Sequence, residues 1–543
     1  MKSTMMDVPL SLTNLALYST TAHGDGRVLT WTGTGSRSCS YGELGGRIAR
    51  LAGALRALGV DGDQRVGTFC WNNQEHLEAY LAVPAMGAVL HPINIRLFPE
   101  QLVYVVNHAE DEVVIVDGTL AEPFGRLLPK LPCVRHVLVT GDADLATVAA
   151  DGVEVHRYAD ALAAAEPTFP WPEIDERQAA GMCYTSGTTG NPKGVVYSHR
   201  STYLHSSALA RGDVAALSQD DRVLPVVPMF HANAWGLPYA SVLVGADLLM
   251  PDRFLQGEPL AAMIEAERPT VAGAVPTIWT GLLQHARGAG TDLSSLRKVI
   301  CGGSAVPRSL MLAYEQEFGV TVRHAWGMTE TSPLASTAFP PQELTGEEAL
   351  RCRLSQGRIL PEVQYRLVGG DGSVVPNDGE SLGELEVRGP WVTESYYRED
   401  SPEKFQDGWL RTGDVGTVDE RGFFTITDRA KDVIKSGGEW ISSVDMENAL
   451  MAHAGVFEAA VIAIPDETWS ERPLACVVAA ADATPDPQEL RESLRAEFAG
   501  WQLPDQFTFV DEIPKTSVGK FDKKVLRQRY ADDELEIRQV AHG

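Results

Sequence analysis

The sequence predicts an α/β protein with more than one domain, and three observations support this. A chain of 543 residues is too long for a single hydrophobic core. Short β-branched runs such as "DEVVIVDG" and "LRKVICGG" end in glycine or aspartate, which is typical of buried parallel strands. Helical stretches such as residues 257–268 lie between these runs. The alternation predicts α/β sheets with ligand-binding loops at the ends of their strands.

The individual elements follow from local patterns. Residues 40–60 place Leu, Ile and Ala at helical spacing and reach a glycine at Gly59, so we expect one helix there. After about residue 360, polar and apolar residues alternate between Gly- and Asp-rich turns, which predicts antiparallel hairpins. A further change of pattern follows "FFTITDRAKDVIKSGGEW".

These changes divide the chain into three predicted parts. We expect a large N-terminal domain at 1–427, made of α/β sheets and a β-rich subdomain. A linker at 428–433 would lead to a small α+β domain at 434–543. The division predicts that ligand-binding loops belong mainly to the large domain.

The composition excludes several classes of partner. The net charge is −27, from 46 basic and 73 acidic residues, and such a surface repels nucleic acid and anionic lipid. No run of about 18 apolar residues is present, and Asp7, Pro9 and Asn14 interrupt the start of the chain, so we expect neither a membrane span nor a signal peptide.

The seven cysteines are scattered along the chain. They form no CxxC pair and have no paired histidines nearby in the sequence, which argues against a zinc site and against a disulfide framework. Free thiols are typical of the reducing cytoplasm. We therefore expect a cytoplasmic protein.

Residues 184–194, "YTSGTTGNPKG", combine glycines, hydroxyl residues and one lysine. Glycines allow backbone N–H groups to approach an anion, and the hydroxyls and Lys193 add further donors, so the stretch predicts a phosphate-binding loop. The spacing matches neither GxxxxGK[ST] nor GxGxxG. The following residues read as a strand, a turn and a helix, which would allow a helix N-terminus to lie near the anion. A flexible surface loop is the alternative interpretation.

The stretch "YTSGTTGNPKGVVYSHR" resembles the phosphate loop of acyl-adenylate-forming enzymes, which include acyl- and aryl-CoA synthetases, luciferases and peptide-synthetase adenylation domains. Within that family, "VPMFHANAWGLPYA" and "KSGGEWISSVDMENAL" look most like the medium- and long-chain fatty-acyl-CoA synthetase branch. The family's other motifs follow in its order: "CGGSAVP" (301–307), "HAWGMTETSP" (324–333), "GWLRTGDVG" (408–416), "DRAKDVIKSGGEWIS" (428–442) and "PKTSVGK" (514–520).

The resemblance implies a ligase that works in two half-reactions. A carboxylate, already ionised at pH 7, would attack the α-phosphate of ATP to give acyl-AMP and pyrophosphate, with Mg²⁺ as cofactor. Coenzyme A would then displace AMP. Other acids or oxyacids, and an acceptor other than coenzyme A, remain alternatives. A non-catalytic nucleotide-binding protein is disfavoured because Glu330 and Lys520 are both present.

The resemblance also assigns roles in the nucleotide site. Lys520 would stabilise transition-state charge, Thr329 would contact the α-phosphate, and Glu330 would hold Mg²⁺. Asp414 would accept both ribose hydroxyls, with Arg429 nearby. The remaining nucleotide-binding residues would be Thr185, Ser186, Gly187, Thr188, Thr189, Gly190 and Lys193 at the phosphates, and Gly303, Ser304, Ala305, Trp326, Gly327 and Met328 around adenine.

Roles for the acid, for coenzyme A and for domain movement follow in the same way. His231 would lie near the reacting carboxylate, and Lys431 would be the hinge about which the small domain rotates. The acid pocket would be lined by Asn233, Trp235, Val275, Pro276, Thr277 and Trp279, and the coenzyme A tunnel by Lys435, Ser436, Gly437, Gly438, Glu439 and Trp440. The N-terminal stretch resembles members that form homodimers.

Several of these residues have a structural alternative. Trp326 and His231 are of types that are often buried in a core, Asp414 suits a turn, and Glu330 with Thr329 suits a helix start. The sequence departs from the branch at four positions: Ile359, Glu362, Ser395 and Ser470. Ser470 stands where glycine or glutamine is common, which bears on how coenzyme A would dock.

Overall fold

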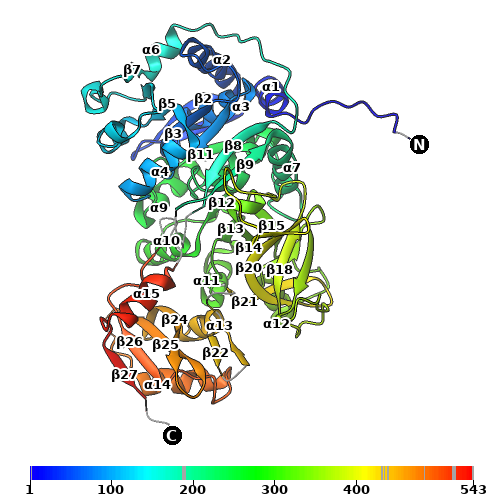
Figure 1. Ribbon diagram of the computed structural model, residues 1–543, viewed down its shortest axis with the longest axis vertical. Helices are drawn as coiled ribbons and strands as arrows, with labels where there is room; N and C mark the ends of the chain where they lie inside the picture. The colour runs from blue at the N-terminus through cyan, green and yellow to red at the C-terminus, as the bar shows by residue number, and fades with distance from the viewer. Residues whose placement is uncertain are drawn as a thin grey trace.

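The structure is a computed structural model that describes residues 1, 3–185, 191–429, 432, 434–436, 439–481, 483–515 and 521–540. Figure 1 shows three sheets with helices around them. Strands of the first 430 residues build two of the sheets, and strands from residue 434 onward build the third. The fold is of the mixed α/β class that the sequence predicts.

The seven-stranded sheet contains the β5 strand that the sequence predicts. Its order is β7-β6-β5-β3-β4-β8-β9, and all neighbouring pairs are parallel except β8 and β9. Its core consists mainly of branched aliphatic and aromatic side chains. The strands are β3 (Arg65–Phe69), β4 (Val89–Pro92), β5 (Asp111–Val116), β6 (His136–Val139), β7 (Glu154–Arg157), β8 (Ala179–Tyr184) and β9 (Gly194–Ser198).

The fourteen-stranded sheet joins a parallel half to an antiparallel half. The parallel half has the order β14-β13-β12-β10-β11-β1, with β2 added antiparallel at its edge. Its strands are β1 (Arg27–Trp31), β2 (Ser36–Ser40), β10 (Arg222–Pro225), β11 (Asp247–Met250), β12 (Val271–Ala274), β13 (Lys298–Gly302) and β14 (Thr321–Gly327).

The antiparallel half confirms the hairpins expected after about residue 360. It continues the sheet in the order β17-β18-β20-β21-β16-β15, with β19 paired to β20. Its strands are β15 (Leu334–Thr337), β16 (Gly357–Ile359), β17 (Gln364–Val368), β18 (Gly383–Arg388), β19 (Phe405–Gln406), β20 (Trp409–Val418) and β21 (Phe423–Arg429).

The helices of this part follow from capping and apolar spacing. In α2 (Tyr41–Ala57), Ser40 and Glu43 form a reciprocal capping box, and Gly59 follows the helix with a φ of +93°. The predicted helix at 257–268 is α9 (Gly257–Glu267). The other α-helices are α1 (Leu12–Ala22), α3 (Gln74–Ala85), α4 (Pro99–Ala109), α5 (Ala121–Gly125), α6 (Tyr158–Ala163), α7 (His199–Ala210), α8 (Leu237–Val244), α10 (Pro276–Ala289), α11 (Arg308–Phe318) and α12 (Gly346–Leu354).

The C-terminal elements form a separate body at the bottom of Figure 1. Its sheet has the order β23-β22-β25-β26-β27, with β24 paired to β25. The elements are β22 (Ile434–Ser436), β23 (Glu439–Ile441), α13 (Ser443–Met451), β24 (Val456–Asp466), β25 (Ser470–Ala479), α14 (Pro487–Ser493), β26 (Gln506–Phe509), α15 (Lys523–Ala531) and β27 (Ile537–Gln539).

One local expectation is wrong. The helix after the phosphate loop, α7, does not begin near the loop, because β9 runs antiparallel to β8 between them. Gly194 pairs with Tyr184 at the loop end of the hairpin, whereas Ser198, the N-cap of α7, pairs with Ala179 at the other end. Four strand residues separate these ends, which is about 13 Å. The dipole of α7 therefore contributes little at the loop.

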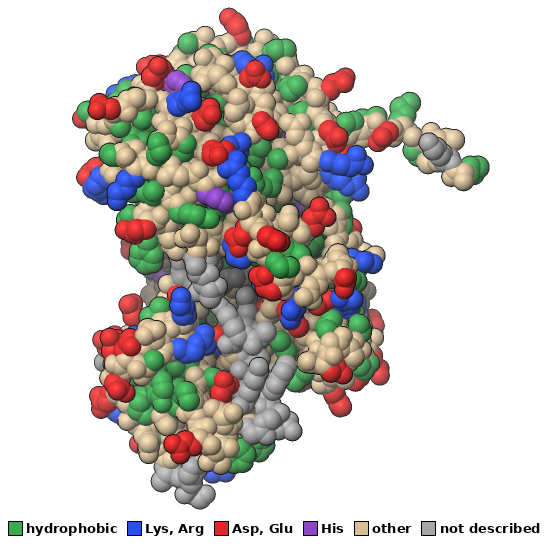
Figure 2. Space-filling view, viewed as in Figure 1, with side chains coloured by type: hydrophobic (Ala, Val, Ile, Leu, Met, Phe, Trp, Pro, Cys, Tyr) green, Lys and Arg blue, Asp and Glu red, His purple; other side chains and the backbone are tan. Residues whose placement is uncertain are grey.

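Charged side chains of both signs lie on the surface (Figure 2). On the face in Figure 2, acidic and basic side chains are interspersed and do not gather into one basic patch. Within the described residues, no helix is both long and apolar enough to cross a bilayer. All seven cysteines are free thiols.

Candidate active site

A cavity of about 300 Å³ lies where the two large sheets meet the loops between them. Its walls come from the residues beside the β8–β9 loop, from the carboxyl ends of β13 and β14, and from the short 3₁₀ helices η4 (Ala232–Gly236) and η5 (Thr329–Thr331). Many of the predicted site residues line it. They are Thr185, Lys193, His231, Trp235, Gly303, Trp326, Gly327, Met328, Thr329 and Glu330.

Other predicted residues do not line the cavity. Asn233 is buried next to it, and Val275 and Pro276 form the start of α10. Trp279 is a core residue, because its indole N–H donates to the carbonyl of Ala274 (3.0 Å) and the ring is fully buried. The further predicted residues that do not line the cavity are Ser304, Ala305, Thr277 and Asp414.

Two tyrosines fix the η5 turn that carries Thr329 and Glu330. The hydroxyl of Tyr396 donates to Oε1 of Glu330 (2.6 Å), and the hydroxyl of Tyr197 donates to the backbone carbonyl of Thr329 (2.8 Å). The backbone N–H of Thr393 donates to the carbonyl of Glu330 (2.8 Å). Burial and the neighbouring Glu330 raise the pKa of Tyr396. The phenol therefore stays protonated and orients the carboxylate at the cavity wall.

Lys193 already has a carboxylate partner. Its ammonium lies 2.5 Å from Oε1 of Glu399 and 3.1 Å from the hydroxyl of Ser401. It also lies 4.8 Å from the centre of the Tyr396 ring, in a cation–π arrangement. An anion that enters the cavity would compete with Glu399 for this ammonium.

Trp326 has two roles that the sequence left as alternatives. Its ring lines the cavity, and it also packs edge-on against Phe424 with 5.9 Å between ring centres. Its indole N–H donates to Oδ2 of Asp414 (2.8 Å), whose side chain is buried. The ring thus connects the cavity wall to Asp414 and fixes the orientation of that carboxylate.

The other end of the cavity depends on an uncommon backbone. Five consecutive residues of η4, Ala232–Gly236, have φ between +43° and +77°, the left-handed region that L-residues rarely adopt. Asn233 supports the turn, because Oδ1 accepts a hydrogen bond from Tyr80 (3.2 Å). The turn directs Trp235 into the cavity. Backbone strain of this kind clusters at ligand sites.

A buried histidine supports the wall behind this turn. Nε2 of His205 accepts a hydrogen bond from the backbone N–H of Leu334 (3.1 Å), and the ring packs against Gly236. Burial lowers the pKa of His205 to about 3, so the ring is neutral at pH 7. A Cβ at Gly236 would lie 2.7 Å from this ring, which explains why a glycine occupies that position.

Apolar side chains make up the surface around Trp235. At position 273 a Cβ would lie 2.6 Å from Leu237, so glycine is the residue that fits there. This end of the cavity therefore suits an apolar group, whereas the η5 end offers charge. Beside Trp235, the apolar lining includes Leu209, Leu237, Ile300, Pro333 and Leu334.

Comparison with known families shows which family the chain belongs to. The family model described as "AMP-binding enzyme" matches residues 18–397, and the model described as "AMP-binding enzyme C-terminal domain" matches residues 445–520. The chain belongs to the AMP-binding enzyme family. It is an acyl-CoA ligase of the adenylate-forming type, as the order of its motifs predicted.

Relatives of this AMP-binding enzyme are similar over almost their whole length. A long-chain-fatty-acid–CoA ligase of Thermus thermophilus is 46% identical over 537 residues, 97% of each chain. A 3-methylmercaptopropionyl-CoA ligase of Ruegeria pomeroyi is 43% identical, over 97% of this chain and 98% of its own. A medium-chain-fatty-acid–CoA ligase of Ectopseudomonas oleovorans is 43% identical over 97% of each chain.

Solved structures share the fold. The anthranilate CoA ligase AuaEII, in complex with anthranoyl-AMP, matches with a TM-score of 0.87 at 24% identity, over 98% of this chain and 100% of that one. ATP-bound MatB from Rhodopseudomonas palustris matches with a TM-score of 0.82 at 26% identity, over 97% of this chain and 100% of that one. The likeness extends over both the large and the small body of the fold.

The small body of this AMP-binding enzyme is joined to the large sheet near the end of β21. Oδ2 of Asp428 accepts a hydrogen bond from the backbone N–H of Ser443 at the start of α13 (2.8 Å). Ser436 pairs with Ser470, which has a φ of +70°. A left-handed backbone favours glycine, one of the two residue types, with glutamine, that the family resemblance leads us to expect at position 470.

Several predicted residues lie outside what the structure describes. For Arg429, Lys435, Glu439 and Trp440 only the backbone is described, in β21, β22 and β23. The residues wholly outside the described ranges are Ser186, Gly187, Thr188, Thr189, Gly190, Lys431, Gly437, Gly438 and Lys520.

The sequence analysis missed some residues of the site. Tyr396 lines the cavity and orients Glu330, although its stretch "TESYY" was noted only for Ser395. Glu403 and Lys404 also line the cavity, and no motif among those quoted contains them. The family resemblance of its stretch was a signal for Tyr396, whereas the places of Glu403 and Lys404 depend on the tertiary fold.

Proposed function

We propose that this acyl-CoA ligase activates a medium- or long-chain fatty acid. The observation that carries the proposal is the apolar part of the cavity lining, where Trp235 and aliphatic side chains lie beside the space. Each buried CH₂ contributes about 0.8 kcal/mol, so such a wall favours an alkyl tail. The long- and medium-chain fatty-acid ligases among the relatives support the same assignment.

The nucleotide end supports the first half-reaction. A carboxylate oxygen of the acid attacks the α-phosphorus of ATP, and the bond to pyrophosphate breaks. We assign Thr329 to the α-phosphate, Lys193 with the 185–190 loop to the leaving phosphates, and Asp414 to the ribose hydroxyls. Lys520 would stabilise the charge that develops at the α-phosphate. None of these roles requires a general base.

The residues present fit a Mg²⁺ ion. Glu330 is a carboxylate on the cavity wall, held by Tyr396, and oxygen is the ligand type that Mg²⁺ prefers. The ion, when bound, would neutralise phosphate charge. Glu330 therefore serves, in this proposal, to position that charge beside Thr329.

The second half-reaction would transfer the acyl group to coenzyme A. We propose that the chain divides into 1–427 and 434–543 about a linker at 428–433, with Lys431 as the hinge. The strand β22, where Ser436 lies beside Ser470, would then form part of the coenzyme A tunnel with Lys435, Gly437, Gly438, Glu439 and Trp440. The sulfur of coenzyme A would attack the acyl carbon and release AMP.

ATP–pyrophosphate exchange tests the proposal. The panel would contain straight-chain acids from acetate to palmitate, 3-(methylthio)propanoate and several aryl acids, each measured before and after coenzyme A is added. We expect exchange to be fastest with medium- or long-chain acids, followed by thioester formation. Exchange with aryl acids alone would overturn the fatty-acid assignment. Exchange without thioester would overturn coenzyme A as the acceptor.

A second candidate substrate is a short thioether acid such as 3-(methylthio)propanoate. The observation that favours it is the similarity to 3-methylmercaptopropionyl-CoA ligases over nearly the whole chain. A thioether is apolar and would suit the same wall. A maximum of exchange at this acid, with slower exchange for octanoate and longer acids, would select this candidate.

Substitution of Lys520 tests the assigned chemistry. Lys520→Ala should lower the exchange rate by about 10²–10³-fold, the usual cost of removing one transition-state donor. The matched control is Lys515→Ala in the same segment, because Lys515 forms a surface ion pair with Glu458 (2.7 Å). Equal rates for the two variants would contradict the role of Lys520.

Two further parts of the proposal concern the setting of the enzyme. Free thiols in all seven cysteines support a reducing, cytoplasmic location. Exposed apolar side chains near the N-terminus, Met5, Met6, Val8 and Tyr18, support a homodimer. Light scattering on the full chain, compared with a variant that carries Met6→Ser and Val8→Ser, would test the dimer.

A further inference from the structure

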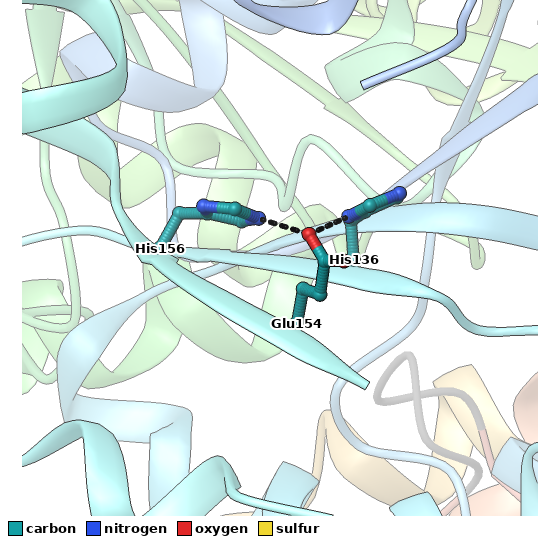
Figure 3. Close-up of side chains that lie close together, drawn as sticks. All are labelled: His136, Glu154 and His156. Carbon is teal, nitrogen blue, oxygen red and sulfur yellow. Dashed lines mark ion pairs between the residues drawn. The ribbon is translucent and has the colours of Figure 1, made fainter. Parts of the chain in front are cut away.

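A cluster of metal-ligating side chains lies far along the chain from the active-site motifs. His136 on β6 and Glu154 and His156 on β7 converge at the edge of the seven-stranded sheet (Figure 3). None of these residues lines the active-site cavity. The sequence argued against a zinc site because the cysteines form no CxxC pair and have no paired histidines nearby, but here two histidines 20 residues apart meet across neighbouring strands.

The strand register explains why the three side chains meet. Glu154 and His156 are two residues apart on β7, so they project from the same face of the strand. In the parallel pairing, His136 stands beside Glu154 on the neighbouring strand. The strand β7 ends the order of this sheet, so its outer edge pairs with no further strand of the described sheet.

The distances suit a shared metal better than hydrogen bonds. Oε2 of Glu154 lies 3.5 Å from Nδ1 of His136 and 3.8 Å from Nε2 of His156. The three ligand atoms all lie within 4.8 Å of one another. Ligands at about 2.0–2.1 Å around a tetrahedral Zn²⁺ are separated by about 3.3–3.4 Å, so small side-chain movements would complete the geometry.

Apart from their ion pairs with Glu154, the two ring nitrogens have no hydrogen-bond partner among the described residues. Nδ1 of His136 and Nε2 of His156 are inaccessible to solvent and form no hydrogen bond there. The carboxylate of Glu154 is 71% exposed and free to adjust its position.

We propose that His136, Glu154 and His156 bind one divalent transition-metal ion of the zinc type, with water as the remaining ligand. Two imidazoles and one carboxylate suit zinc and its neighbours, whereas Mg²⁺ and Ca²⁺ prefer all-oxygen sites. The ion would join β6 to the edge strand β7. It would therefore stabilise the large domain without taking part in acid activation.

Metal titration of the full chain tests this proposal. The protein, prepared without a polyhistidine tag and treated with chelator, would be titrated with ZnCl₂ by calorimetry and with CoCl₂ by visible absorption. We expect one Zn²⁺ per chain at this site, an intense four-coordinate Co²⁺ spectrum and a higher Tm with Zn²⁺. The absence of a saturable one-to-one phase in both titrations would overturn the proposal.

Variants separate this site from other ligands. His156→Ala should weaken Zn²⁺ binding by at least about tenfold, since loss of even an outer-shell partner costs that much. His285→Ala, a half-buried histidine on α10, and Cys133→Ser, a partly exposed thiol before β6, should leave binding unchanged.

Two results from these variants would contradict the assignment. Retained binding in the double variant His136→Ala/His156→Ala would exclude these ligands. Lost binding in Cys133→Ser would assign the metal to the thiol. Circular dichroism of each variant would confirm folding, and unchanged ATP–pyrophosphate exchange would show that the metal site is independent of the proposed function.

Discussion

The two ends of the active-site cavity are built in different ways. At the end near η5, which we assign to the nucleotide, short polar contacts hold each group: Tyr396 holds Glu330, Trp326 holds Asp414, and Glu399 holds Lys193. At the apolar end, shape dominates, because a left-handed turn and a buried histidine position Trp235 and its aliphatic neighbours.

The two ends are restricted to different degrees in the residues that can form them. Charged and hydrogen-bonded groups must stand at set positions to serve phosphates, so their residue types and spacing are restricted. An apolar wall can be formed by many combinations of side chains of suitable volume. Under the proposed function, the polar end would serve the reaction and the apolar end would select the acid that fits.

The largest expected effect is at the nucleotide end. Glu330→Gln keeps the size of the side chain and the acceptor for Tyr396 but removes the charge. We expect the exchange rate to fall by about 10²–10³-fold, with a higher Mg²⁺ requirement. Glu347→Gln, at an exposed ion pair with Arg308, is the control and should retain the rate. A wild-type rate for Glu330→Gln would mean that charge here is not needed.

The second effect tests whether the neutral His205 supports the apolar end. Burial holds its pKa at about 3 in the folded protein, whereas the unfolded value is about 6.5. As pH falls below 6.5, the unfolded chain binds the proton first, so the stability that this residue contributes is lost toward pH 3. This loss approaches about 1.4 kcal/mol per pH unit.

The variant His205→Gln cannot take up that proton but can still accept from Leu334. Urea unfolding at pH 7 and pH 4.5 should show a smaller loss of stability for the variant than for the wild type. Acidic groups and other histidines affect both proteins alike. An identical loss in the two proteins would show that His205 is protonated in the folded state.

The third effect concerns Trp235. Trp235→Ala would enlarge the apolar end, and we expect the ratio of kcat/KM for long acids over short acids to change by about tenfold, because one or two buried CH₂ groups are worth that much. ATP affinity should stay the same. Trp501→Ala, on the surface of the small body, is the control. An unchanged ratio would show that Trp235 does not line the acid pocket.

The smallest effect measures the strain in the left-handed turn. Ala234 and Ala240 are both fully buried, but Ala234 has a φ of +49° and Ala240 lies in α8. Ala240→Gly should cost about 2 kcal/mol, from lost helix propensity and a lost methyl. Ala234→Gly should be within about 1 kcal/mol of neutral, because glycine relieves the left-handed penalty. Equal costs, measured by urea unfolding, would mean that the turn is not strained.

A contrast between local patterns and tertiary contacts separates what the sequence could predict from what it could not. The parallel strands, the helix at Tyr41–Ala57, the later hairpins and the family itself followed from periodicity and motifs, because these are local properties. The antiparallel direction of β9 places the start of α7 away from the β8–β9 loop. This direction depends on strand pairing, so the sequence patterns did not predict it. The support of Glu330 by Tyr396 and the convergence of His136 with His156 depend on tertiary contacts.

If Lys193 binds phosphate as proposed, its ion pair with Glu399 makes phosphate binding an exchange of anions at one ammonium. Under the proposed role, an incoming phosphate replaces one anion with another at the same ammonium, so the local charge changes less than in a site with a solvated lysine. The loss of the ion pair with Glu399 then offsets part of the attraction between the phosphate and Lys193. This exchange would moderate the affinity for the nucleotide. When pyrophosphate departs, Glu399 would pair with the ammonium of Lys193 again.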